Sequence, residues 1–105
     1  MNIFLFDAET EAERDDYECD LDEAINEFYE LSDADGSFLG INTYDNRIIQ
    51  FLYQNDDEWL LDIPSKDNPQ EEFFQRLVTY DKCVEIITSL FNGITVDTIQ
   101  QSLSI

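Results

Sequence analysis

The sequence predicts an α+β fold, in which an antiparallel meander sheet of about four strands packs against two helices. Two segments, 20–31 and 81–93, repeat apolar residues at the spacing of one helix face. Between them, residues 37–63 alternate runs of β-branched and aromatic residues with short polar turns, as hairpins do. Because a chain of 105 residues supports one core, we expect a single acidic α+β domain over 1–105.

The first helix has a clear start signal. Asp20 can cap it, and Glu23 stands three residues later, as in a capping box. Its apolar face consists of Leu21, Ala24, Ile25, Phe28 and Leu31. Upstream, Ile3 to Phe6 predicts a short strand, whereas 7–19 is almost wholly polar and predicts a loop or frayed helix.

The middle of the chain predicts three strands of the meander. The first spans 37–44 and is followed by the turn residues Asp45 and Asn46, which tolerate positive φ. The second spans 47–53 and is apolar on both faces, as in a central strand. The third spans 59–63, where we expect Trp59 to be buried in the core, and Pro64 closes it.

The C-terminal part predicts a fourth strand and the second helix. Residues 73–80 alternate as a strand does, although Asn68 and Pro69 also resemble a helix start. Asp81 is the expected cap of a helix that ends at Asn92-Gly93. The tail, 94–105, has apolar residues at irregular spacing and predicts at most one further short element.

The charge is extreme and uneven. The chain has 25 acids against 5 bases, a formal net charge of −20, and 14 of the acids lie within residues 7–35. Such a surface repels phosphates, so we expect no direct binding to nucleic acid and no membrane association. A cationic protein is the partner that this charge favours. Solubility or adaptation to high salt is the alternative explanation.

Catalysis is not indicated. Without histidine the chain lacks the commonest general base, and Ser-His or Cys-His nucleophile systems are impossible. Asp33 and Asp35 resemble part of a calcium loop, but the first and twelfth positions would then be Leu31 and Asn42, which are not ligands. We therefore expect a binding protein and not an enzyme, with no catalytic residue, no metal site and no cofactor.

The cysteines and the N-terminus indicate a cytoplasmic protein. Cys19 and Cys83 lack the spacing of a metal site and are expected to be buried apolar residues, with a single bridge between them as the alternative. The first residues lack a basic stretch and a long apolar run, so no signal peptide is expected. A monomer or a small homo-oligomer fits equally well.

The candidate partner-binding residues are the acids of the first helix and of the 54–58 loop. On the helix they face away from the apolar stripe, and like charges such as Glu23 and Glu27 have no base between them to relieve their repulsion. The full set is Asp22, Glu23, Glu27, Glu30, Asp33, Asp56, Asp57 and Glu58.

A resemblance to a known class of proteins covers 35–93. Its segments read D-G-S-F-L-G-I, R-I-I-Q-F-L-Y-Q, W-L-L-D-I-P and C-V-E-I-I-T-S-L-F-N-G. This order resembles small acidic bacterial immunity proteins of polymorphic or contact-dependent toxin systems. The resemblance implies a toxin inhibitor that binds a cognate toxin domain, often a basic nuclease, and occludes it with an acidic surface.

Two other functions remain open at the level of sequence. A nucleic-acid mimic of the anti-restriction or anti-CRISPR type would use carboxylates in place of phosphates. An acidic secretion chaperone would hold an unfolded client through apolar grooves.

Overall fold

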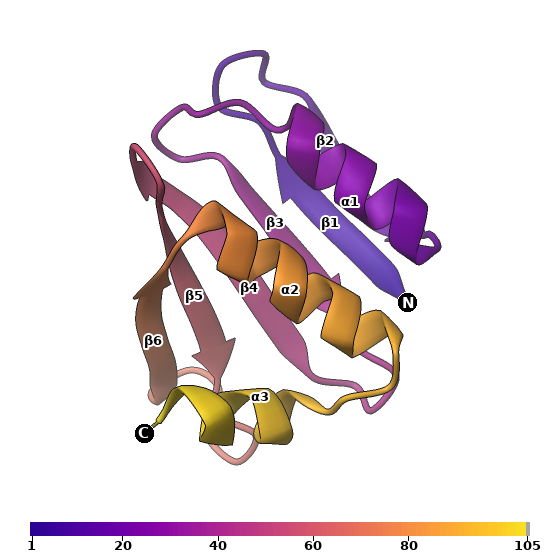
Figure 1. Cartoon of the computed structure of the whole chain (residues 1–105), viewed down its shortest axis with the longest axis vertical. Coiled ribbons are helices and arrows are strands. Elements are labelled where there is room, and N and C mark those ends of the chain that lie inside the picture. Colours follow the sequence, from indigo (N-terminus) through magenta and orange to yellow (C-terminus); the bar gives the residue numbers. More distant parts are fainter. Residues whose placement is uncertain (105) are drawn as a thin grey trace.

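The computed structural model describes residues 1–104, and within them the chain forms one antiparallel sheet with three helices (Figure 1). The elements are β1 (Asn2–Phe6), β2 (Glu13–Glu18), α1 (Leu21–Glu30), β3 (Phe38–Asn42), β4 (Ile48–Asn55), β5 (Glu58–Pro64), β6 (Phe73–Val78), α2 (Tyr80–Phe91) and α3 (Val96–Leu103). The predicted α+β class is confirmed. The predicted number of elements is too small, because the sheet has six strands where about four were expected, and three helices pack on it where two were expected.

The strand order is β2-β1-β3-β4-β5-β6, with every neighbouring pair antiparallel. The predicted meander is therefore right for β3 to β6. The N-terminal strands join it differently: β1 and β2 form a hairpin, and α1 then carries the chain back so that β3 pairs with the free edge of β1. This return places α1 over the sheet.

Strand β2 corrects the expectation of a loop or frayed helix over 7–19. Its residues, Glu13–Glu18, are exposed except for the half-buried Tyr17, so no alternation of apolar residues marks the strand. An edge strand needs a partner on one side only, and charged side chains keep other chains from pairing with its free side. Residues 13–18 therefore form a strand because they pair with the apolar β1, and their own composition does not predict it.

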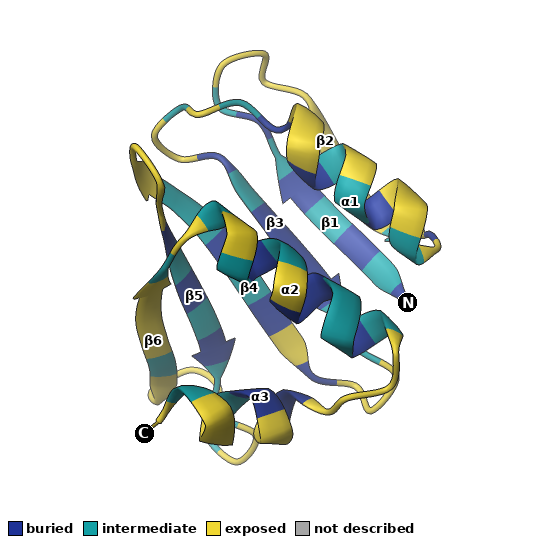
Figure 2. Ribbon diagram, viewed as in Figure 1, coloured by how far each residue is buried: buried dark blue, intermediate teal, exposed yellow. Residues whose placement is uncertain are grey.

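The core lies between the sheet and the three helices, which all pack on one face of it (Figures 1 and 2). Alternate strand residues point into it, and cross-strand partners such as Ile41 and Ile49, or Phe51 and Leu61, are fully buried. Phe28 of α1 lies 4.7 Å from the ring of Trp59 and 4.9 Å from that of Tyr80, measured between ring centroids. Trp59 is buried, as predicted.

The capping residue that the local sequence predicts is right for α1 and wrong for α2. The predicted capping box is confirmed: the Asp20 side chain accepts from Glu23 N, and the Glu23 side chain accepts from Asp20 N. The cap predicted for α2 is wrong, because Thr79 Oγ1 accepts from Lys82 N. Asp81 instead occupies the first turn, where the helix dipole favours a negative charge.

The C-terminal predictions are largely confirmed. Residues 73–78 form strand β6, and α2 ends at Phe91 before Gly93, whose φ of 94° suits glycine. The tail forms the short helix α3, held to the β3–β4 turn where Arg47 Nη1 donates to Asp97 Oδ1 at 2.7 Å. Cys19 and Cys83 are both buried and free, so the alternative of a bridge between them is not observed.

Candidate functional site

The predicted partner-binding acids fall into separate places on the surface. Asp22, Glu23, Glu27 and Glu30 lie on α1, and Asp33 follows its end. Asp56 and Asp57 form the turn between β4 and β5, and Glu58 is the first residue of β5. All are exposed except Glu27, which is half-buried. The question is which of them the fold brings together.

The fold gathers Asp33, Asp56 and Asp57 around one groove, which we call the acidic groove. It lies where the end of α1, the β4–β5 turn and the start of α2 meet, and its volume is about 390 Å³. Its lining residues are Tyr29, Leu31, Asp33, Asp56, Asp57, Trp59, Tyr80 and Asp81. Four carboxylates from three separate segments thus surround the groove, and its lining residues include no lysine or arginine.

The β4–β5 turn is held in place by its own acids. Asp56 has a φ of 39°, in the left-handed region that Asp tolerates better than most residues. Asp57 Oδ1 accepts from Tyr80 N at 3.0 Å, so it satisfies one of the free N–H groups at the start of α2. Asp57 therefore positions the turn against the helix, while Asp33, Asp56 and Asp81 are exposed to solvent.

The floor of the groove is aromatic. The ring of Tyr80 stacks on Phe28 at an interplanar angle of 10°, and Trp59 is buried beside them. At the rim Tyr29 is 76% exposed. Burial, followed by the neighbouring Tyr29, Cys83, Asp81 and Asp33, raises the pKa of Tyr80. Such a site suits a cation, because carboxylates accept its hydrogen bonds and aromatic faces attract its charge.

Sequence reasoning missed Tyr29, Tyr80 and Asp81 as groove residues. A usable signal existed for Tyr29: it stands on α1 outside the apolar face, so an aromatic ring is placed on the polar side of the helix. No local pattern marks Tyr80 or Asp81, because their place depends on how α2 packs against the β4–β5 turn.

Other acids of α1 are engaged within the protein. Glu23, besides its part in the capping box, accepts from Tyr17 Oη at 2.7 Å, and this bond raises the pKa of Tyr17. Glu27 Oε1 lies 3.6 Å from Arg14 Nε of β2. The expectation that no base relieves the α1 acids is therefore wrong for Glu27. Glu30 lines a separate depression with Glu27 and Arg14.

One acid of the 7–35 segment is not a surface group at all. Asp7 is 7% exposed, and its carboxylate accepts from Ser32 Oγ and from the backbone N–H groups of Ser32, Glu9 and Thr10. These bonds, led by that from the Ser32 hydroxyl, lower the pKa of Asp7. Asp7 therefore joins the β1–β2 loop to the end of α1, and its carboxylate is occupied by hydrogen bonds within the protein.

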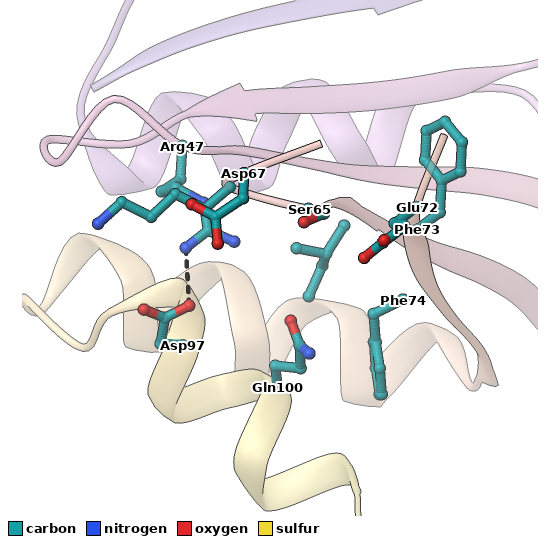
Figure 3. A pocket seen from close by; sticks show the side chains of 10 residues that line it. Arg47, Ser65, Asp67, Glu72, Phe73, Phe74, Asp97 and Gln100 are labelled. Atoms are coloured by element: carbon teal, nitrogen blue, oxygen red, sulfur yellow. Dashed lines mark hydrogen bonds and ion pairs between the residues drawn. The ribbon is translucent and has the colours of Figure 1, made fainter. Parts of the chain in front are cut away.

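A second cavity, of about 370 Å³, lies between α3 and the loop that joins β5 to β6, and charges of both signs line it (Figure 3). Its lining residues are Arg47, Ile63, Ser65, Lys66, Asp67, Glu72, Phe73, Phe74, Asp97 and Gln100. Arg47 is 8% exposed and pairs with Asp97, so its charge is already compensated inside the protein. This pair has a structural role, because it ties α3 to the β3–β4 turn.

Three further findings concern metal ions, membrane-spanning helices and similar proteins. Within residues 1–104, no group of three or more Cys, Asp or Glu side chains is arranged to hold a metal ion. No helix in that range is long and apolar enough to cross a membrane. Comparisons with protein families, curated proteins and solved structures give no match for this chain.

Proposed function

We propose that this protein binds a basic protein and occludes it, and that the acidic groove makes the central contact. One observation carries the proposal: four carboxylates and the two tyrosines Tyr29 and Tyr80 surround a single groove that no base lines. The carboxylates of Asp33, Asp56 and Asp81 are exposed there and make no side-chain hydrogen bond or ion pair within residues 1–104. Their charge is thus available to a ligand, unlike that of Glu23 or Asp7.

The chemistry of the groove favours arginine on the partner. A guanidinium can donate hydrogen bonds to two carboxylates and stack on a tyrosine ring at the same time. Each exposed charge pair contributes only about 0.2–1 kcal/mol, so affinity requires several contacts together. The net charge of −20 adds long-range attraction, which speeds encounter with a basic partner and excludes acidic ones.

The partner class that we propose is a toxin domain with a basic active site, such as a nuclease. Support comes from the resemblance of 35–93 to small bacterial immunity proteins, together with the acidic groove. An inhibitor of this kind acts in the cytoplasm by covering the basic residues that hold the toxin's substrate, and it needs no catalytic group of its own.

The test compares two triple variants with equal charge loss. The groove variant carries Asp33→Asn, Asp56→Asn and Asp81→Asn, and the control carries Asp15→Asn, Asp22→Asn and Glu30→Gln, which are exposed acids outside the groove. Binding of an octa-arginine peptide is measured by calorimetry. We expect the groove variant to bind about tenfold more weakly than the control, as the sum of three exposed contacts predicts.

The biological arm expresses the C-terminal domain of the protein encoded immediately upstream, which the proposal expects to be toxic, and measures whether this protein restores growth. The control variant should rescue growth, and the groove variant should not. Equal peptide binding by both triple variants, or equal rescue, would overturn the groove as the contact site. Competition by DNA for the same partner with no protection of cells would instead favour a nucleic-acid mimic.

A further inference from the structure

The face of the sheet opposite the helices carries a continuous apolar row. Because α1, α2 and α3 all pack on the other face, no helix of residues 1–104 covers this one (Figures 1 and 2). Five side chains from consecutive strands stand in register on it. We call them the apolar row: Phe6, Phe38, Leu52, Leu60 and Leu77.

The row is exposed enough to bind a partner. Leu77 on the edge strand β6 is 53% exposed, and the other four side chains are half-buried. The ring of Phe38 lies 6.3 Å from Phe6 and 6.2 Å from Phe4, between centroids, so aromatic surface widens the row at its β1 end. With strands spaced about 4.8 Å apart, five of them give a row of about 19 Å. Contiguous apolar surface of this kind marks interaction sites.

The charges around the row are all negative. Glu13 pairs with Phe6 at one end, and Asp62 stands between Gln50 and Gln75 in the next register. Asp16 is on the same face, because its Oδ1 accepts from Asn2 Nδ2 at 2.7 Å. The strand bases lie on the helix-covered face instead: Arg14 is opposite Leu5, and Arg76 is opposite Leu61.

We infer that this open face docks an amphipathic helix whose apolar stripe is flanked by lysine or arginine. The row crosses the strands, so a ligand that follows it cannot pair with the sheet backbone and must satisfy its own N–H and C=O groups, as a helix does. At 1.5 Å per residue, about 13 helical residues span 19 Å. A second copy of this chain fits poorly, because it would bring acids against acids.

The inference rests on the proposed function, since the helix would belong to the same kind of basic partner. It adds a second, apolar contact on the far side of the sheet from the acidic groove. The two contacts differ in their salt dependence. Screening weakens binding at the groove, whereas burial of the apolar row persists at high salt.

The experiment uses a synthetic helical peptide of leucine and lysine, with leucines at helical spacing, and a matched leucine and glutamate peptide. Binding is measured at 0.3 M NaCl with the whole protein. We expect Leu77→Ser to weaken binding of the lysine peptide about tenfold, because one anchoring side chain is lost. The control Phe73→Ser changes an apolar residue that is 49% exposed on the same strand but outside the row, and it should bind as the parent does.

Several results would overturn the inference. If Leu77→Ser binds the lysine peptide as the parent does, the apolar row is not the binding site. If the glutamate peptide binds as tightly as the lysine peptide, the face has no preference for a basic helix. Chemical-shift changes confined to Tyr29 and Tyr80 would assign the peptide to the acidic groove, which leaves the proposed function intact. Self-association abolished by Leu77→Ser would assign the face to a second copy. If Leu77→Ser unfolds, Leu77→Thr replaces it, because threonine is β-branched and favours a strand more than serine does.

Discussion

The ring of Phe4 on β1 lies directly over the backbone of Gly40 on β3, its cross-strand partner. A β-carbon built on Gly40 would overlap the far end of this ring. Space, and not backbone conformation, therefore requires glycine here. In return the aromatic ring covers a strand position that has no side chain of its own to pack.

Replacing Gly40 with alanine tests this relationship. The methyl group would push the Phe4 ring into solvent, and we expect a loss of about 1–2 kcal/mol in the free energy of unfolding, measured with urea. In a Phe4→Ala background no ring is present to displace, so Gly40→Ala should cost little or even stabilise the strand. Equal costs in the two backgrounds would show that the ring does not determine the residue at 40.

The buried carboxylate of Asp7 predicts a pH dependence. Because hydrogen bonds lower its folded pKa, its contribution is complete above the unfolded value of about 4 and is lost as the pH falls through the folded pKa. We expect Asp7→Asn to cost about 1–3 kcal/mol at pH 7, since it disturbs buried hydrogen bonds, and the difference from the parent to shrink below pH 4.

Asp22→Asn is the matched control for Asp7, because it removes the same charge from an exposed site on α1. Its stability should stay within about 0.5 kcal/mol of the parent. Thermal unfolding of the three proteins between pH 3 and pH 7 gives the comparison. A constant gap between Asp7→Asn and the parent over this range would exclude the ionised Asp7 as its source.

The excess of 20 negative charges predicts stabilisation by salt. The molecule measures 34 × 27 × 26 Å, so at about 0.01 M ionic strength, where the Debye length is about 30 Å, most of its carboxylates repel one another. Raising NaCl to 0.5 M should raise Tm by about 5 °C or more. Calorimetry checks this, and KCl should act equally because screening does not depend on which ion is used. A Tm that falls or stays constant would contradict the prediction.

The two thiols should be unreactive in the folded protein. Burial, with a smaller contribution from Asp57, raises the pKa of Cys83 to about 12, and burial also raises that of Cys19. At pH 8 about one Cys83 thiol in ten thousand is then a thiolate, the form that iodoacetamide attacks. We expect iodoacetamide to alkylate the thiols only when urea unfolds the protein, and mass spectrometry measures the extent of alkylation. The variant Cys19→Ser isolates Cys83, and rapid labelling without denaturant would contradict its burial.

Much of the fold could be predicted because its signals are local. The capping box of Asp20 and Glu23, the apolar face of α1 and the strands on either side of Asp45-Asn46 each depend on residues a few positions apart. Strand β2 could not be predicted, since it is a strand only by pairing with β1. The helix α3 is short and depends on burial of Val96 and Ile99 against the rest of the core.

The candidate site was predicted only in part, for a similar reason. The sequence identified Asp33, Asp56 and Asp57 as exposed acids, but Asp81 lies far from them along the chain and joins them only through the packing of α2. It counted Asp7 only within the charge of residues 7–35, and did not reveal that Ser32 holds this carboxylate in the interior. Identical carboxylates therefore differ in role according to neighbours that sequence distance does not reveal.

By itself the sequence determined that the chain is an acidic α+β domain, because composition sets net charge and residue spacing sets helix and strand periods. Tertiary structure alone decided which carboxylates meet in one groove. It also decided which of them instead cap a helix, pair with Arg14 or accept a hydrogen bond from Ser32. It also decided that an apolar row stays uncovered on the open sheet face. These features arise from contacts between distant segments, and such contacts exist only once the sheet has formed and the helices have packed on one of its faces.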